Sequence, residues 1–439
     1  MVISRGTILS ILGLAAIFYV TAAAQDLAGD WQGTLQTGRS TLRLVLHFAK
    51  ANDATWRATM CNIDDTPDRG AGIAMTSVVI HGAEMRLTAD SIRGSYQGKL
   101  SPDGKTISGI WMQGPSLVLN FERATKDTAW ADPSPHRIEL VTVDQGIDLE
   151  VLDWGGTGRP LVLLAGLGNT AHVFDKFAPK LASRYHVYGI TRRGFGLSSA
   201  PVPDQSNYGA DRLGDDVLAV IESLKINRPV LVGHSIAGEE LSSVATRHPE
   251  RIAGLVYLDA GYAYAYYDRT RGDFTVDTLD LRRKLGRLID APPQEQKQIV
   301  SDMLQTDLAQ FQKDLRERQK ELEAAIRPGG SPIPTPNGTR SPSQAIFAGQ
   351  QKYTDIRVPV LAFYAVPHAR FARIADPEER AAAEKKDRED TGAQAKALEA
   401  GVPSARVVRL ANASHYVFVS NEDDVLRQMV VFLNGLKTD

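Results

Sequence analysis

A serine in the second half of the chain stands in a context that could make it a nucleophile. Ser235 lies in Gly233-His-Ser-Ile-Ala237, directly after the apolar run 230–232 and before a helical stretch. A serine on a sharp strand-to-helix turn holds its hydroxyl out from the sheet edge in a strained conformation, so the positions two before and two after it must be small. Gly233 and Ala237 meet that requirement. We therefore predict that Ser235 is a nucleophile rather than an ordinary helix-capping serine.

A histidine near the end of the chain could serve as the base that such a serine needs. A serine hydroxyl is a weak nucleophile until an adjacent base, usually histidine, takes its proton. His415 follows the last predicted strand, 406–410, and precedes the final helical stretch, 422–436, so we predict that His415 is this base. None of the other eight histidines forms a His-x-x-x-His or Cys/His pair with metal-ligand spacing, so we expect no metal site and no cofactor.

The carboxylate that would orient His415 has more than one candidate. The segment 363–370, after the next-to-last strand, contains no carboxylate, and His368 stands close to the place where one would be expected. Asp259 ends the preceding strand, 255–258, and is our prediction for the acid. It could instead cap the turn that follows, and Asp376 is the alternative acid if its loop folds back.

Two backbone amides are predicted to bind the developing oxyanion. Such donors commonly come from the residue after the nucleophile and from a loop after an earlier strand, which here are Ile236 and Leu167. We expect Gly166, His234 and Tyr262 to line the substrate pocket.

The elements that must position these residues alternate between β-like and helical runs. Strands alternating with helices indicate βαβ units and a mainly parallel sheet covered on both faces. A stretch at about 261–355 interrupts this order and is predicted to be a helical cap insertion. The charge-dense stretch 376–400 is interpreted as a solvated helix. The strands are predicted at 137–143, 147–153, 161–165, 186–190, 230–232, 255–258, 358–364 and 406–410.

The N-terminal part of the chain has a different pattern. Residues 25–126 read as short alternating segments separated by turn residues, which predicts a small antiparallel barrel or sandwich. Asp103-Gly104 supplies the positive φ of a tight hairpin. The segment 127–136 contains two prolines and is predicted to be the linker to the domain at 137–439.

The first 24 residues have the features of a secretory signal peptide. Arg5 precedes the apolar run 7–20 and a series of small residues, so we expect cleavage after Ala24. The alternative is an uncleaved membrane anchor. Cleavage would leave a secreted or periplasmic protein with no stable membrane insertion.

The composition argues against a nucleic-acid-binding function and against a fold stabilised by disulfides. The formal charge is −2 and no long run of Lys or Arg occurs, so we expect no nucleic-acid partner. A single cysteine, Cys61, rules out an intramolecular disulfide. No oligomeric state is predicted.

Residues 137–439 resemble the α/β-hydrolase superfamily. The resemblance is carried by Ala165-Gly-Leu-Gly168, Arg193-Gly-Phe-Gly-Leu-Ser198, Gly233-His-Ser-Ile-Ala237 and Ser414-His415. It implies a triad hydrolase that forms an acyl-enzyme. Thr191, where an aspartate often stands, Ala237 and the missing late carboxylate depart from the usual pattern.

These residues predict hydrolysis of a carboxylic ester or lactone of a small or medium organic substrate. Serine rather than aspartate at the turn disfavours a dehalogenase or epoxide hydrolase that forms an alkyl-aspartate intermediate. Amidase, peptidase or carbon–carbon hydrolase chemistry could use the same three side chains. A non-catalytic binding protein that keeps the fold is the alternative from another class.

Overall fold

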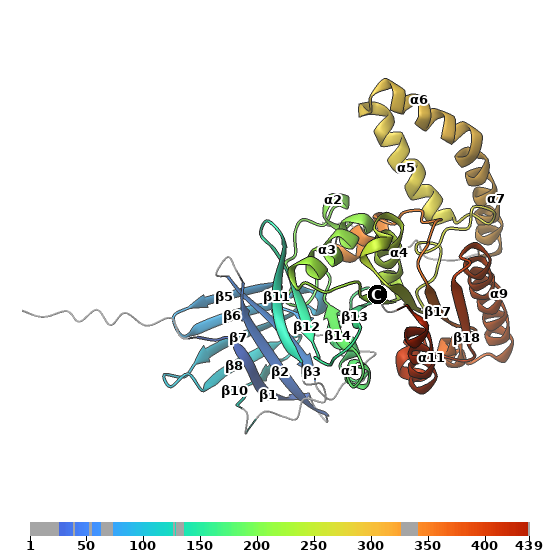
Figure 1. The fold of residues 1–439 in the computed structure, drawn as a ribbon. Coiled ribbons are helices and arrows are strands. Elements are labelled where there is room, and N and C mark those ends of the chain that lie inside the picture. The colour runs from blue at the N-terminus through green and yellow to red at the C-terminus, as the bar shows by residue number, and fades with distance from the viewer. Residues whose placement is uncertain are drawn as a thin grey trace, which may run out of the picture.

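The computed structural model describes residues 26–37, 40–51, 55–62, 73–125, 128, 136–325 and 341–437. It contains two β-sheets that lie side by side, an N-terminal antiparallel sheet of ten strands and a second sheet of eight strands that is flanked by helices (Figure 1). The predicted signal peptide and most of the predicted linker lie outside the described residues.

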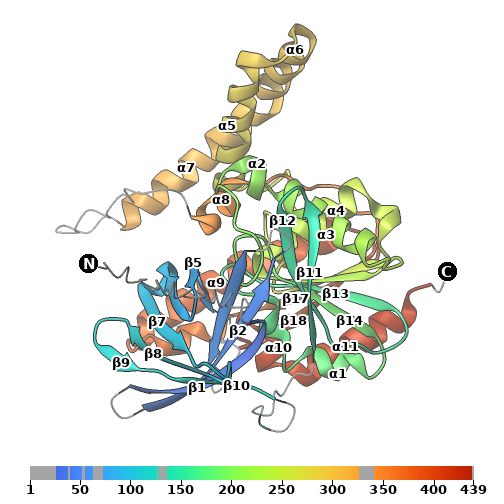
Figure 2. The same ribbon diagram turned by 90° about the vertical axis from the view of Figure 1, so that its left-hand side faces the viewer.

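The N-terminal sheet curls around its own apolar core (Figure 2). Its order is β4-β3-β2-β1-β10-β8-β7-β6-β5, with β9 on β8, so β4 and β5 are neighbours in sequence but stand at opposite ends of the order. The short chain between them bonds to both ends of the sheet, because Met75 N donates to Ala58 O of β3 at 2.9 Å and Thr76 N donates to Thr88 O of β6 at 2.6 Å. Trp31 and Trp111 fill the core. The strands are β1 (Gly29–Thr37), β2 (Ser40–Lys50), β3 (Trp56–Asn62), β4 (Ile73–Ala74), β5 (Ser77–His81), β6 (Glu84–Ala89), β7 (Gly94–Leu100), β8 (Thr106–Met112), β9 (Ser116–Val118) and β10 (Phe121–Arg123).

The second sheet has the order β11-β12-β14-β13-β15-β16-β17-β18. Strands β13 to β18 pair parallel with one another, whereas β12 pairs antiparallel with both β11 and β14 at one edge. The α/β-hydrolase fold class, preceded by an all-β sheet, is therefore confirmed. The strands are β11 (Arg137–Asp144), β12 (Ile147–Asp153), β13 (Pro160–Leu164), β14 (His186–Ile190), β15 (Val230–His234), β16 (Gly254–Leu258), β17 (Val360–Ala365) and β18 (Ala405–Leu410).

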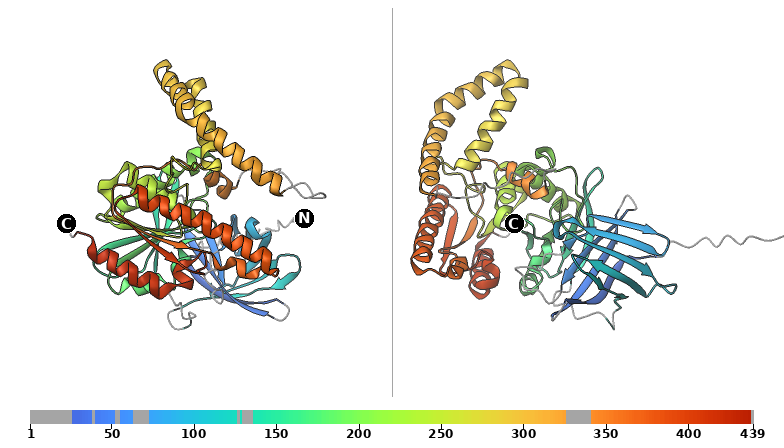
Figure 3. Two further views of the ribbon diagram at one scale, coloured as in Figure 1. Left: turned by 90° about the vertical axis from the view of Figure 1, so that its right-hand side faces the viewer. Right: turned by 180° about the vertical axis from the view of Figure 1, so that it is seen from behind.

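Helices cover both faces of this sheet because its strands are apolar on both sides. Leu231 of β15 packs into one buried cluster, and its neighbours Val230 and Val232 pack into the other. The first cluster includes side chains of α3 (Ala210–Ser223), α4 (Gly238–Arg247) and α9 (Pro377–Gly401). The second includes side chains of α1 (Ala178–Ala182) and α11 (Glu422–Gly435). Helices α9 and α11 sit at the end of the molecule away from the N-terminal sheet (Figure 3).

The insertion between β16 and β17 divides into two parts. Helices α5 (Phe274–Asp290), α6 (Pro293–Asp302) and α7 (Leu308–Ala325), with a π-helical turn at Met303–Asp307, form an arm that projects from the body (Figures 1 and 3). The short helix α8 (Pro342–Ala348) packs instead against the body, beside α2 (Gln205–Tyr208). Only α8, among these described helices, therefore lies over the region of the predicted nucleophile. No helix built from the described residues has both the length and the apolar composition that a membrane crossing requires.

Candidate active site

The strand β15 ends in the turn that carries Ser235. Ser235 has φ 54°, a left-handed conformation that is strained for a residue with a side chain, and the chain then enters α4 through a 3-10 turn at Ser235–Ala237. The turn is tight on both sides. A Cβ at Gly233 would lie 2.7 Å from Leu241 Cδ1, and one at Gly238 would lie 2.1 Å from Ala260 O. These contacts explain why small residues flank Ser235.

Asp259 follows the next strand, β16, and lies against His415. The Asp259 carboxylate is fully buried, and its Oδ2 stands 2.6 Å from His415 Nδ1. Because an ionised carboxylate can only accept, His415 Nδ1 carries the proton and Nε2 is left as the basic nitrogen. Burial opposes ionisation of Asp259, but hydrogen bonds from His368 and His415 outweigh it and hold the pKa of Asp259 below its usual range.

The remaining lone pairs of Asp259 are also occupied. Its Oδ1 accepts from Ala365 N at 3.0 Å and from the Tyr262 hydroxyl at 2.8 Å. Tyr262, expected to line the substrate pocket, therefore faces the acid. Asp376, the alternative acid, instead caps helix α9 by accepting from Glu379 N at 2.8 Å.

A second histidine and a second carboxylate extend this group. His368 stands between Asp259 Oδ2, 2.8 Å from its Nε2, and Asp387 Oδ2, 2.9 Å from its Nδ1. Burial alone would lower the pKa of His368, but hydrogen bonds with the two carboxylates raise it above its usual value. Asp387 is 7% exposed although it belongs to the helix predicted to be solvated, so that interpretation is wrong for this residue. Sequence reasoning noted the position of His368 but missed Asp387.

His234 joins the serine turn to the histidine loop. It is 1% exposed, and burial lowers its pKa to about 3, so the ring is neutral. Its Nε2 donates to His415 O at 3.1 Å, and its ring lies 4.7 Å from the His415 ring. Among the described residues no hydrogen bond links Ser235 to His415. Such a bond often tightens only when substrate binds.

The predicted oxyanion residues lie on the same side of the turn. Leu167 packs against a buried cluster that contains Ile236, and the Ile236 amide lies in the first turn of a helix, where N–H groups lack an intrahelical partner. Gly166 lets the Leu167 loop approach closely, because a Cβ there would lie 2.7 Å from His234 Nδ1 and 3.2 Å from Ser235 Cβ. The Leu167 loop and the start of the 3-10 turn at Ser235–Ala237 therefore lie close together beside the predicted nucleophile.

A buried ion pair lies behind this site. Arg192, 6% exposed, donates through its Nη2 to Glu240 Oε2 at 3.0 Å and to Ala165 O at 2.9 Å. Its Nε also donates to Glu240 Oε1. The guanidinium therefore ties the end of β13, which leads to Leu167, to helix α4, which begins behind Ser235.

Tyrosines after Asp259 take different positions. Tyr264 interacts with Ser235: burial and the Asp259 and Glu239 carboxylates raise the Tyr264 pKa well above its usual value, while a hydrogen bond with the serine opposes them. Tyr266 and Tyr267 are buried. Of these three tyrosines, therefore, only Tyr264 interacts with Ser235 among the described residues.

Comparison with known proteins gives one family. Residues 161–428, more than half of the chain, match the model of the alpha/beta hydrolase family. The chain is 34% identical over 116 residues to a fluoroacetate dehalogenase of Burkholderia sp, covering 26% of this chain and 38% of that protein. It is 34% identical over 119 residues to a putative carbamate hydrolase, RutD, of Caulobacter segnis, covering 27% and 44%. The chain thus spans less than half the length of these curated relatives.

A solved structure is also similar. The crystal structure of E-2-(acetamidomethylene)succinate hydrolase aligns with a TM-score of 0.41 and 20% identity, covering 69% of this chain and 100% of that one.

Proposed function

The chain belongs to the alpha/beta hydrolase family, and from this premise we propose that it hydrolyses a carboxylic ester or lactone through an acyl-enzyme on Ser235. The observation that carries the proposal is the 2.6 Å contact between Asp259 Oδ2 and His415 Nδ1, beside a serine at a strained strand end. Its relatives include a dehalogenase and a putative carbamate hydrolase, so hydrolysis is common to them while the bond that is cleaved differs.

The proposed reaction uses each group once in each half. Ser235 Oγ attacks the ester carbonyl carbon as His415 Nε2 takes its proton, and the Leu167 and Ile236 amides bind the oxyanion. His415 then gives the proton to the leaving alcohol, and the acyl group stays on Ser235. A water molecule repeats the attack with His415 as base, which releases the acid and restores the serine. Asp259 stabilises the imidazolium in both halves.

Serine as the first nucleophile favours acyl transfer over displacement of a halide. An alkyl-enzyme ester that water opens at its carbonyl requires a carboxylate nucleophile, and the turn offers a hydroxyl. The dehalogenase named above is therefore a guide to the family and not to the bond that this protein cleaves.

Apolar side chains beside the oxyanion residues favour a substrate with an apolar group. Ala345 and Ile346 of α8 form a buried cluster with Ile236, and the partly buried side chains that pack against it are Leu167, Phe195 and Tyr264. We propose that the acyl or alcohol part of a small or medium substrate contacts these partly buried side chains as it passes α8. The signal-like segment 1–24 further favours action outside the cytoplasm.

The alternative of a non-catalytic binding protein loses its motivation. That reading depended on the lack of a carboxylate in segment 363–370, and Asp259 contacts His415 from another strand. Amide and carbon–carbon hydrolysis use the same groups, and a panel of matched ester, amide and β-diketone substrates would separate them.

Labelling with a fluorophosphonate tests the proposal directly. We expect the folded full-length protein to be labelled on Ser235, mapped by mass spectrometry, and to hydrolyse short-chain nitrophenyl esters. Ser235→Ala should lose both signals, whereas Ser206→Ala, at an exposed serine of α2, should keep both. An unlabelled wild type, or label that persists in Ser235→Ala, would overturn the proposal.

A further inference from the structure

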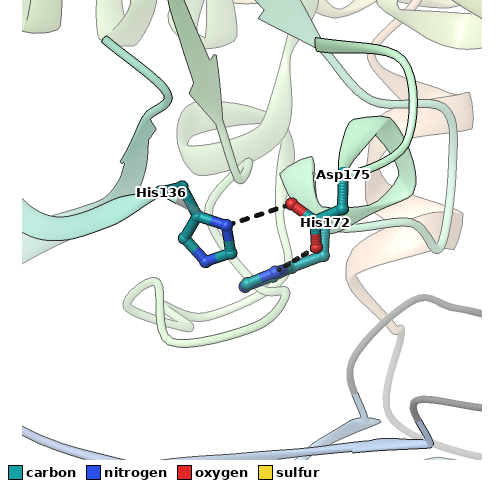
Figure 4. A group of neighbouring side chains, drawn as sticks. All are labelled: His136, His172 and Asp175. Carbon is teal, nitrogen blue, oxygen red and sulfur yellow. Dashed lines mark hydrogen bonds and ion pairs between the residues drawn. The ribbon is translucent and has the colours of Figure 1, made fainter. Parts of the chain in front are cut away.

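We propose that His136, His172 and Asp175 form a binding site for a divalent transition-metal ion of the zinc type, where the two sheets meet (Figure 4). The site is separate from Ser235, Asp259 and His415, and it does not depend on the proposed hydrolase function. His136 directly precedes β11, and His172 and Asp175 belong to the 3-10 turn Ala171–Phe174 and the residue after it.

The spacing of the donor atoms fits a metal ion. Asp175 Oδ1 lies 3.2 Å from His136 Nδ1, and its Oδ2 lies 3.0 Å from His172 Nδ1. All three donors fall within 4.8 Å of one another. Zinc binds imidazole nitrogen and carboxylate oxygen at about 2.0–2.2 Å, so donors around it in a tetrahedron lie roughly 3.3 Å apart. Each histidine thus lies near that edge length from one oxygen of Asp175, and the complete set of donors stays within 4.8 Å.

Hydrogen bonding alone does not account for this arrangement. Although His136 Nδ1 approaches Asp175 Oδ1 to 3.2 Å, this buried oxygen makes no hydrogen bond among the described residues. Both histidine side chains are only 5% exposed, so water does not readily replace the missing partner. A bound cation would supply this carboxylate oxygen with a partner.

A buried glutamate behind His172 supplies an independent observation. Glu150 is fully buried, and neither of its carboxylate oxygens has a hydrogen-bond partner in the described residues. Its Oε1 lies 3.6 Å from His172 Nε2, which is buried and unpartnered as well. A histidine that binds a metal through one nitrogen almost always donates its other N–H to a carboxylate, a backbone carbonyl or water. Glu150 stands where that second carboxylate belongs.

A divalent cation would also suit the charge of the site. When both imidazoles bind it in their neutral form, the cation neutralises the two negative charges that Asp175 and Glu150 bring into the junction. The nearest further histidine, His47 of β2, stacks on His172 at 5.9 Å and already pairs with Asp30 at 2.6 Å. Imidazole with carboxylate favours zinc and its neighbours in the transition series over calcium or magnesium.

The segments that the ion would join are far apart in sequence. It would link the start of β11 to the turn after the Leu167 loop, while His47 packs on this turn from the N-terminal sheet. The expectation of no metal site rested on local spacing, and such spacing cannot detect donors separated by tens of residues.

Zinc binding to the full chain tests the inference. After treatment with a chelator and dialysis, we expect the protein to take up one zinc ion per chain, measured by elemental mass spectrometry, with a rise in melting temperature. His136→Ala and His172→Ala should each abolish both effects. Glu150→Gln should weaken zinc binding by about tenfold to a hundredfold, as loss of a carboxylate behind a ligand usually does.

Two controls identify the site. His81→Ala, at an exposed histidine of β5, should bind zinc like the wild type. His368→Ala alters the other group of donors that could hold a metal, Asp259, His368 and His415, and should also keep the zinc. Wild type without stoichiometric zinc, or zinc lost in His368→Ala and retained in His136→Ala, would overturn the inference. Circular dichroism identifies folded variants, and if His172→Ala is unfolded, His136→Ala decides.

Discussion

Asp259→Asn is the substitution that most sharply separates a catalytic acid from a buried structural carboxylate. The change is nearly isosteric, so Ala365 N and the Tyr262 hydroxyl can still donate to the remaining carbonyl oxygen. What is lost is the negative charge 2.6 Å from His415 Nδ1. The amide nitrogen would also favour the His415 tautomer with its proton on Nε2, which cannot accept the serine proton.

The expected loss of rate in Asp259→Asn follows from how deeply Asp259 and His415 are buried. Asp259 is fully buried, but the His415 side chain is 40% exposed, so an effective dielectric constant of about 20 is appropriate. Two unit charges about 4 Å apart then interact by about 4 kcal/mol. Loss of this stabilisation of the imidazolium should slow acylation by roughly a thousandfold.

The assay is the second-order rate of fluorophosphonate labelling, together with kcat/KM for a nitrophenyl ester. Asp387→Asn is the matched control, because Asp387 contacts His368 and Arg370, and among the described residues it makes no contact with His415. We expect it to slow labelling less than about tenfold, by a distance-weakened electrostatic effect. The reasoning is refuted if folded Asp259→Asn keeps a tenth or more of the wild-type rate, or if Asp387→Asn is equally slow.

Three further substitutions test the surroundings of the site. The pKa of His368 is raised in the folded protein, so its contribution to stability is complete below about pH 6.5 and is lost as pH rises through the folded pKa. His368→Gln should therefore flatten the fall in the free energy of unfolding with rising pH, measured with urea. Equal slopes for the variant and the wild type would contradict this. Gly166→Ala places a Cβ 2.7 Å from the buried His234 ring. It should lower kcat/KM about tenfold to a hundredfold with only a small change in melting temperature. An unchanged kcat/KM would show that the loop can shift freely. Arg192→Met leaves Glu240 buried without its partner and should lower the free energy of unfolding, measured in urea, by about 3–5 kcal/mol. A decrease of less than about 1 kcal/mol would mean that Glu240 becomes protonated or hydrated in the variant.

Much of this organisation could be predicted because its signals are local. The strands of the second sheet are short apolar runs between helical stretches, and the predicted strands from 137–143 to 406–410 are confirmed to within a few residues. The hairpin at Asp103-Gly104 is confirmed too, with φ 69° at the glycine. The structure places Ser235 at the end of β15 and Asp259 at the end of β16, as the motif and the strand ends predicted.

The rest could not be predicted because it depends on contacts between distant segments. Asp387 looks like any other charge on a polar helix, and only the packing of α9 against the sheet reveals that it meets His368. The group around His172 draws on residues from β12, the segment before β11 and the turn after β13, none of which carries a motif. The projecting arm of α5 to α7 is likewise decided by where an insertion docks, which composition does not show.

The left-handed backbone at two neighbouring strand ends has a consequence for engineering and for evolution. Ser235 and Asp259 have φ values of 54° and 49°, a region that glycine occupies without the cost of roughly 1–3 kcal/mol that other residues bear. Selection for thermal tolerance alone would therefore favour glycine at Ser235, a position on which the proposed turnover depends, so stability and activity conflict there. At Asp259 the buried contacts with His368 and His415 oppose the same change. Ser235→Gly should melt at a higher temperature than Ser235→Ala in calorimetry. If it melts at the same or a lower temperature, the left-handed backbone at Ser235 does not destabilise the folded protein.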